Sequence, residues 1–243
     1  MIYVQVRGSV RVLVFNGLQK LTLLDFPGKV ACTLFTAGCD FRCPFCHNAS
    51  LVYRDDKLET FTDDEILDFL RKRKGILEGV AITGGEPMLN SGLADFMKKV
   101  RELGYAVKLD TNGSYPDRLA DVIESGLADK VAMDIKNSKE KYGLTVGIPD
   151  YDIKPVEESV DILLNCKIDY ELRTTVTADF HEESDFEKIG TWIKGAKAYF
   201  LQNFVNSGEL IDENIKGVSP EEMNGFLAVV RKYIPDAQLR GVE

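Results

Sequence analysis

The chain has 243 residues, of which 44% are hydrophobic and 28% charged, a balance typical of a globular protein with a substantial core. The formal net charge of −9 argues against general nucleic-acid binding, because a protein that neutralises phosphates needs a basic face. No apolar run approaches the roughly 20 residues that cross a bilayer, so we expect no membrane partner and a cytoplasmic location.

Residues 1–15 alternate apolar with polar and small residues. Arg7 and Arg11 interrupt this stretch, so it lacks the unbroken apolar block of a signal peptide. We therefore expect a strand or hairpin here, within an N-terminal extension that covers residues 1–28.

From residue 30 onwards, short apolar runs alternate with amphipathic segments. The runs predict buried strands at residues 30–35, 79–83, 105–110, 130–134, 170–176 and 198–202. The segments between them predict helices at residues 61–74, 91–103, 116–125, 156–166 and 185–194. Thr62 is the expected N-cap of the first helix, with Glu65 at the capping-box position. A last helix, at 220–233, leads to a short strand at 238–242.

Strands that alternate with helices form a parallel sheet with right-handed crossovers. Six such units are too few for a closed eight-unit barrel. The expected fold is therefore α/β, an incomplete (β/α)6 TIM-like barrel with mostly parallel strands. We expect one domain, with a partial barrel core at 29–204 and a C-terminal loop, helix and strand at 205–243. The irregular stretches 137–153 and 203–218 follow the carboxyl ends of strands, where α/β barrels place functional loops.

Five cysteines are present, and three of them lie close together after the first predicted strand. Cys39, Cys43 and Cys46 have the spacing C-x3-C-x2-C, and thiolates are soft ligands suited to iron–sulfur clusters and zinc. Three cysteines on a four-iron cluster leave one iron free to accept the amino and carboxylate groups of a small molecule. Cys32 and Cys166 stand in apolar runs and are expected to be buried small hydrophobes.

The alternative for this loop is a structural zinc site with His47 as the fourth ligand. His47 directly follows Cys46, and adjacent residues are awkward ligands for one ion. A second motif, Gly84-Gly85-Glu86-Pro87, follows the second predicted strand. Paired glycines let a backbone approach a ligand closely, and Glu86 can pair with an ammonium group.

The cysteine loop, with Phe45 before its last cysteine, together with the Gly-Gly-Glu-Pro motif resembles the signature of the radical S-adenosylmethionine (SAM) superfamily. The resemblance implies that the three cysteines hold a [4Fe-4S] cluster and that Phe45 lies near the adenine of SAM. It implies that Gly84, Gly85 and Glu86 bind the methionyl amino group. It also implies reduction by flavodoxin or ferredoxin and cleavage of SAM to methionine and a 5′-deoxyadenosyl radical.

Two further motifs, Asp-Thr-Asn-Gly at 110–113 and Asp-Ile-Lys at 134–136, end the third and fourth predicted strands. Singly, each has a structural explanation, because Asn-Gly is a common turn and Asp at a strand end often caps a helix. Together they resemble a motif pair of glycyl-radical-enzyme activating enzymes. The resemblance implies a monovalent-cation site whose ligands are Asp110, Thr111, Asp134 and the carbonyl of Ala132. The residues expected to contact SAM there are Asn112 and Lys136.

The sequence at 16–28 and the Cys-His-Asn at 46–48 resemble the longer class of anaerobic ribonucleoside-triphosphate reductase activating proteins. This implies a glycyl-radical enzyme as partner, such as the reductase, and hydrogen abstraction from a backbone glycine. The runner-up is a small-molecule radical SAM enzyme, such as a 7-carboxy-7-deazaguanine synthase-like protein. A third hypothesis is a non-catalytic zinc-binding interaction module.

The later strands offer weaker candidates. Arg173, on the fifth predicted strand, either reaches the SAM ribose or carboxylate or belongs to a buried ion pair. Gln202 is a candidate polar contact to SAM, because Phe204 stands where the relatives have a SAM-contacting histidine. His181 is expected to be a surface residue.

Overall fold

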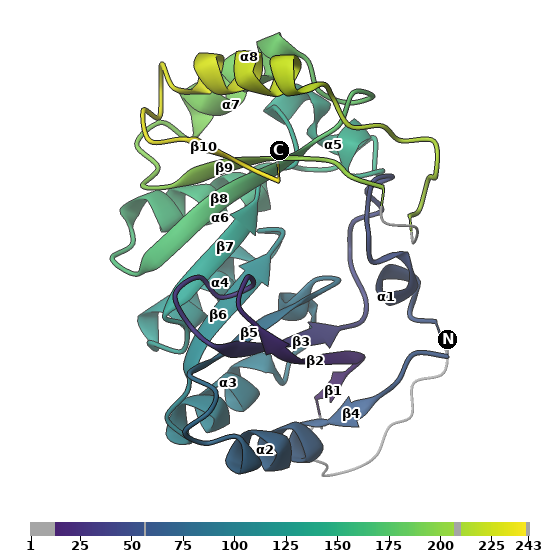
Figure 1. The fold of residues 1–243 in the computed structure, drawn as a ribbon. Coiled ribbons are helices and arrows are strands. Elements are labelled where there is room, and N and C mark those ends of the chain that lie inside the picture. Colours follow the sequence, from purple (N-terminus) through teal and green to yellow (C-terminus); the bar gives the residue numbers. More distant parts are fainter. Residues whose placement is uncertain (1–12, 56, 207–209, 242–243) are drawn as a thin grey trace.

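The computed structural model describes residues 13–55, 57–206 and 210–241 (Figure 1). Most of the strand or hairpin expected at residues 1–15 lies outside these ranges. Its described end is β1 (Val14–Phe15), which pairs antiparallel with β4 (Phe61–Thr62).

One eight-stranded sheet forms the body of the protein, in the order β10-β9-β8-β7-β6-β5-β3-β2. Its strands are β2 (Gly17–Thr22), β3 (Ala31–Thr36), β5 (Gly79–Gly84), β6 (Ala106–Thr111), β7 (Lys130–Asp134), β8 (Asp169–Val176), β9 (Tyr199–Asn203) and β10 (Gln238–Arg240). β2 runs antiparallel to β3, and every other neighbouring pair is parallel. The predicted incomplete α/β barrel is confirmed.

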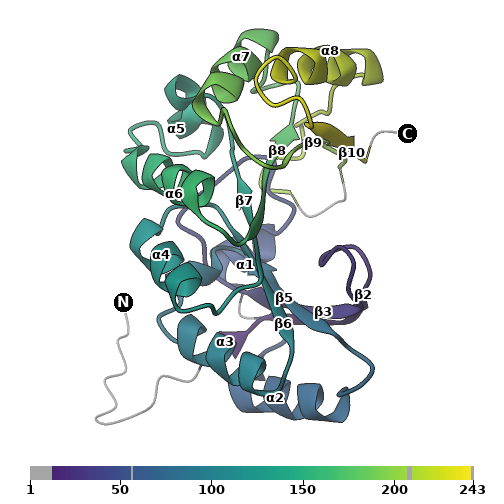
Figure 2. The same ribbon diagram turned by 90° about the vertical axis from the view of Figure 1, so that its left-hand side faces the viewer.

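The helices cover one face of this curved sheet (Figure 2). They are α2 (Asp63–Lys72), α3 (Leu93–Glu102), α4 (Pro116–Glu124), α6 (Lys154–Asn165), α7 (Glu183–Trp192) and α8 (Pro220–Val230). The capping box at Thr62 and Glu65 is confirmed, and it starts α2. Two short helices that the apolar pattern did not predict are α1 (Ala49–Tyr53) and α5 (Tyr142–Thr145). Across the described ranges, every helix is too short or too polar to span a bilayer.

Alternation along β3 separates the core from the inner face of the sheet. Cys32 and Leu34 are buried in the hydrophobic core, whereas Thr33 and Phe35 line a cavity. Since successive side chains of a strand point to opposite faces, the helices pack on one side and a polar inner face remains on the other. This inner face is the open side of the sheet in Figure 2.

A bidentate ion pair ties the last strand to the sheet. The Arg240 guanidinium donates to both carboxylate oxygens of Glu171, at 2.7 and 3.0 Å, across the intervening β9. Glu171 is 1% exposed. Burial by itself would raise the pKa of Glu171, but Arg240 lowers it to about 2, so this carboxylate stays charged above pH 4.

Replacing Arg240 by Met should lower the free energy of unfolding by about 3 kcal/mol at pH 7, because it leaves a buried carboxylate without its bidentate partner. Urea denaturation at pH 7 and pH 4 measures this. The folded pKa of Glu171 is depressed, so its contribution is present above the unfolded pKa and declines as the pH falls towards 2. The loss should therefore be smaller at pH 4. Arg71→Met, which breaks an exposed pair with Asp68, is the control and should cost under about 1 kcal/mol.

Candidate functional site

A cavity of about 500 Å3 opens at the carboxyl ends of the parallel strands. Its walls come from β2, β3 and the loop after it, and from the ends of β5, β6, β7, β8 and β9. Volumes of this size are usual for small-molecule and cofactor sites. Ligand sites at this end of parallel strands are the rule for α/β sheets.

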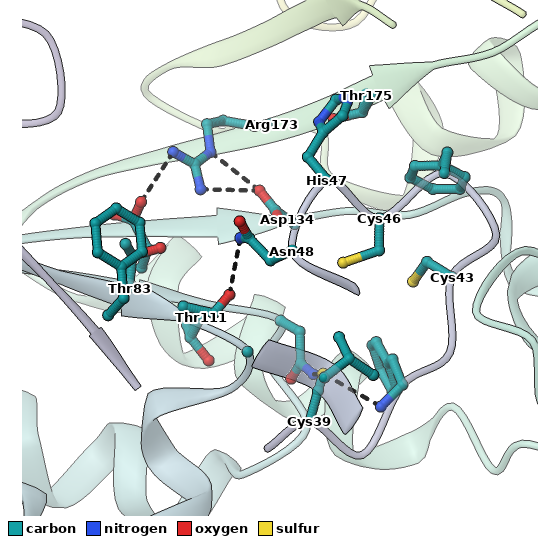
Figure 3. A pocket seen from close by; sticks show the side chains of 18 of the residues that line it. Cys39, Cys43, Cys46, His47, Asn48, Thr83, Thr111, Asp134, Arg173 and Thr175 are labelled. Atoms are coloured by element: carbon teal, nitrogen blue, oxygen red, sulfur yellow. Dashed lines mark hydrogen bonds and ion pairs between the residues drawn. The ribbon is translucent and has the colours of Figure 1, made fainter. Parts of the chain in front are cut away.

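The three clustered cysteines all line this cavity. Figure 3 shows the sulfur atoms of Cys43 and Cys46 turned into it from one stretch of the loop, with Cys39 on the other side. Backbone contacts fix the loop, because the Arg42 N–H donates to the Val146 carbonyl at 2.8 Å and the Arg42 guanidinium donates to the Cys39 carbonyl at 2.7 Å. The structure therefore places all three predicted cluster ligands on the wall of one cavity.

Burial raises the pKa of the Cys39 and Cys43 thiols to about 12, and it also raises the pKa of Cys46. These thiols are therefore protonated in the metal-free chain at neutral pH. Iron binding requires thiolates, so loading the site must release protons. Lys136 lines the same cavity, and its positive charge acts to lower the pKa of Cys43.

Gly84 and Gly85 occupy positions that admit no side chain. Gly84 has φ +128°, and a Cβ there would lie 2.3 Å from the Thr36 carbonyl oxygen. A Cβ on Gly85 would lie 2.1 Å from the Gly38 carbonyl oxygen, just before the cysteine loop. Both residues line the cavity, so their bare backbone forms its wall beside the cysteines. The close approach seen here is to the backbone of residues 36–38, and the predicted approach to a ligand stays a prediction.

Glu86 lies behind this wall. It is fully buried, and its carboxylate accepts hydrogen bonds from the Met88 N–H at 2.9 Å, the Thr111 hydroxyl at 2.9 Å and the Asn112 N–H at 2.7 Å. Burial raises the pKa of Glu86 to about 7, against the opposing effect of these donors. In this structure Glu86 joins the ends of β5 and β6, and a direct contact with an ammonium group stays a prediction.

An arginine joins the two carboxylates that were predicted to hold a monovalent cation (Figure 3). Arg173 Nε lies 3.0 Å from Asp134 Oδ1, and Arg173 Nη1 lies 3.3 Å from Asp110 Oδ2. Lys136 contacts Asp134 at 2.8 Å, and Lys108 contacts Asp110. Three basic groups thus balance two carboxylates.

The monovalent-cation site stays a prediction, and a bound cation would have to share these carboxylates with the basic groups that already pair with them. The Thr111 hydroxyl, a third proposed ligand, donates to Glu86. Burial alone would raise the pKa of Asp134, but Lys136 and Arg173 hold it well below its usual range. Of the two alternatives for Arg173, the structure shows the ion pair.

Other predicted contacts face the same cavity. Asn112 donates to Asp40 Oδ1 at 2.8 Å, and Lys136, Phe45 and Gln202 also line the wall. Phe45 is buried, with its ring centroid 6.0 Å from that of Phe180. Their contacts with SAM stay predictions.

The prediction for His181 was wrong. It is 6% exposed, and its Nε2 lies 2.9 Å from the Lys136 carbonyl oxygen while its Nδ1 accepts from the Thr177 N–H at 3.2 Å. Burial lowers the pKa of His181, so the ring is neutral and Nε2–H donates to the carbonyl. His181 therefore fixes the backbone that carries Lys136. A lone histidine in a polar loop gave no sign of this.

Sequence reasoning missed residues that connect the motifs. Asn48 donates to the Gly84 carbonyl at 3.2 Å and so joins the cysteine loop to the glycine motif (Figure 3). His47 stacks on Phe204, with ring centroids 5.1 Å apart, and its Nε2 lies 2.8 Å from the Val205 carbonyl oxygen. This engages His47 with the loop after β9 rather than with the cysteines. In the sequence, the Cys-His-Asn pattern at 46–48 was the signal that could have pointed to these contacts of His47 and Asn48.

The residues present fit an iron–sulfur cluster with SAM. Soft thiol ligands from one loop share a cavity with the glycine backbone at 84–85, and the absence of side chains there lets β5 pack against the backbone that leads into the cysteine loop. Lys136 supplies a positive charge near the thiols. Cys32 and Cys166 are free thiols that do not line the cavity.

A family profile described as the radical SAM superfamily matches residues 33–193. A protein of Methanocaldococcus jannaschii, described as a candidate glycyl-radical enzyme activating enzyme, is 28% identical over 238 residues, which cover 93% of this chain and 95% of that protein. A GTP 3′,8-cyclase of Helicobacter pylori is 30% identical over 152 residues, 59% of this chain and 47% of the cyclase. The fold is similar to that of a domain of the pyruvate-formate lyase-activating enzyme from Bacteroides vulgatus, with TM-score 0.56 and 15% identity over 67% of this chain and 99% of that domain.

Proposed function

The chain belongs to the radical SAM superfamily, and from this premise we propose that it activates a glycyl-radical enzyme. The proposed partner is anaerobic ribonucleoside-triphosphate reductase, and the proposed electron donor is flavodoxin or ferredoxin. When bound, the [4Fe-4S] cluster and SAM supply an electron and, through cleavage of the sulfonium bond, a 5′-deoxyadenosyl radical that removes a hydrogen atom from the target glycine.

The observation that carries this proposal is the meeting of the Asp110–Gly113 and Asp134–Lys136 motifs at the wall of the cysteine cavity. Arg173 bridges their two carboxylates, and Lys136 extends from the second motif beside the thiols. These groups provide a fixed arrangement of charge for the amino-acid part of SAM. The similarity to the M. jannaschii protein over most of both chains supports the same activity.

The roles of the chain's own residues follow from their positions. Cys39, Cys43 and Cys46 would hold the cluster, and the Gly84-Gly85 backbone would lie against SAM. The buried loop contacts would limit water at the reacting atoms. The cavity lies on the face of the sheet that the helices leave uncovered, and we infer that a segment of a partner protein enters from this side (Figure 2).

The test is to mix reconstituted, reduced protein with SAM and an anaerobic ribonucleotide reductase and to record the electron paramagnetic resonance spectrum. We expect the doublet of a glycyl radical on the reductase. SAM cleavage without that signal across several glycyl-radical enzymes would favour the small-molecule alternative. The partial similarity to the GTP 3′,8-cyclase is the observation that favours this small-molecule alternative.

A further inference from the structure

A buried lysine lies behind the wall of the cavity, and the proposed function gives it no role. Lys108 is 2% exposed and lies on β6, two residues before Asp110. Side chains two residues apart on a strand point to the same face, so both belong to the inner face of the sheet. Asp110 lines the cavity, whereas Lys108 is not among the described residues that do. Burying an ammonium group is costly unless it is paired, and Lys108 is paired with Asp110.

The contact with Lys108 completes the pairing of the two carboxylates at the ends of β6 and β7. Asp110 is contacted by Lys108 at Oδ1 and by Arg173 at Oδ2, the second at 3.3 Å. Asp134 is contacted by Arg173 at Oδ1, at 3.0 Å, and by Lys136 at Oδ2, at 2.8 Å. Each of these carboxylate oxygens therefore has a basic partner among the described residues.

Formal charges show what Lys108 contributes to this group. Three basic side chains and two carboxylates leave it with a net charge of +1. Without Lys108 the same group would be neutral. The neighbouring carboxylates Glu171 and Asp169 do not alter this balance, because two further basic side chains pair with them. These are Arg240 and Lys130.

One surplus positive charge matches the single carboxylate of SAM. This group is where we place the amino-acid part of SAM, and an anion is attracted to a net positive group more strongly in a partly buried cavity than in water. A bound monovalent cation would supply the same single charge to a group that was otherwise neutral. In this chain a lysine side chain already supplies it.

We propose that the Lys108 ammonium takes the place of the monovalent cation predicted for this site, so that the chain binds SAM without a metal cation beside the SAM carboxylate. Lys108 is a positioning residue, because it acts through Asp110 and Arg173 rather than from the cavity wall. The inference concerns SAM binding and holds whichever molecule the radical attacks, so it does not depend on the activase assignment.

The test compares potassium, sodium and tetramethylammonium chlorides at equal ionic strength, because tetramethylammonium is too large to replace a bound alkali cation. One measurement is the Tm of the metal-free chain in each salt. The other is the Kd of radiolabelled SAM for the anaerobically reconstituted protein. The wild type should show the same Tm and the same Kd in all of these salts.

Lys108→Gln keeps a hydrogen-bond donor beside Asp110 and removes the charge. In tetramethylammonium chloride it should weaken SAM binding roughly tenfold, and potassium or sodium should restore most of the affinity. The same cations should raise the Tm of the variant, because they then bind the folded chain and not the unfolded one. Lys108→Met, which lacks the donor as well, is the second variant and should respond to the cations in the same direction.

Lys130→Met is the matched control. Lys130 lies opposite Lys108 in the register of β6 and β7, its side chain is 14% exposed, and it pairs with Asp169 and Glu171 instead of the cavity carboxylates. This variant should lose stability but bind SAM as the wild type does. Its Tm should not depend on which cation is present, so it reports any general effect of the salts.

A rise in the Tm or the SAM affinity of the wild type that is specific to potassium or sodium would overturn the proposal, because an exchangeable cation would then occupy the site. The proposal would also be wrong if folded Lys108→Gln and Lys108→Met bound SAM in tetramethylammonium chloride as tightly as the wild type. SAM binding that depends on Lys108 and not on the cation, without a glycyl radical on any partner, would support this inference while rejecting the activase function.

Discussion

Replacing Cys43 by Ala is expected to abolish SAM cleavage. Cys43 is 6% exposed and lines the cavity with Cys39 and Cys46, and three thiolates are needed to hold a cluster that keeps one iron open. Anaerobic reconstitution followed by absorption spectroscopy and assay of 5′-deoxyadenosine measures the effect. We expect loss of the iron–sulfur absorption and at least a thousandfold fall in product, because without the cluster there is no chemical route to the radical.

The control for this variant is Cys166→Ser, which removes a half-buried thiol that does not line the cavity. It should retain both the cluster and SAM cleavage. Urea denaturation should show that Cys43→Ala remains folded, since truncating Cys to Ala removes a single buried sulfur atom and costs only about 1–2 kcal/mol. A variant that keeps its cluster without Cys43 would contradict the assignment of this ligand.

Replacing Gly85 by Ala should have the second-largest effect, on stability and on the site together. The new Cβ would lie 2.1 Å from the Gly38 carbonyl oxygen and 2.7 Å from its carbonyl carbon, both backbone atoms that cannot rotate away. The end of β5 and the start of the cysteine loop must therefore separate. We expect a loss of at least about 3 kcal/mol in the free energy of unfolding and a strong weakening of SAM binding.

Gly225→Ala is the matched control. Gly225 lies inside α8, and nothing stands within 4 Å of its Cβ position. The same substitution there should stabilise the protein by about 0.5–1 kcal/mol, because alanine favours the helix. Urea denaturation of both variants gives the comparison, and similar stabilities for Gly85→Ala and the wild type would contradict the close packing described for Gly85.

Local patterns predicted much of the fold. The apolar runs gave the parallel strands of the barrel, because each run is short and lies between turn residues. The capping box of Thr62 and Glu65 depends on neighbours three residues apart, so it could be identified before the fold was known. The cysteine motif at 39–46 and the glycine pair at 84–85 could be identified in the same way, because each is a short pattern within one stretch of sequence.

The remaining features depend on contacts between distant segments. Arg173 bridges Asp110 and Asp134 only because β6, β7 and β8 are neighbours in the sheet. His181 is buried because its ring reaches a carbonyl 45 residues away in the chain. The turn between β2 and β3 brings Asp25 to the wall of the cavity. Its leucines are exposed, although such an apolar run in a sequence would ordinarily predict a buried strand. No short-range sequence pattern encodes these contacts between distant segments.

The most direct test of the central claim is to reconstitute the chain anaerobically, measure its iron and sulfide, reduce it with dithionite and add SAM. We predict iron and sulfide in equal amounts, together with stoichiometric formation of methionine and 5′-deoxyadenosine. Bound zinc, no sulfide and intact SAM after reduction would contradict the assignment of Cys39, Cys43 and Cys46 as the ligands of a cluster that cleaves SAM.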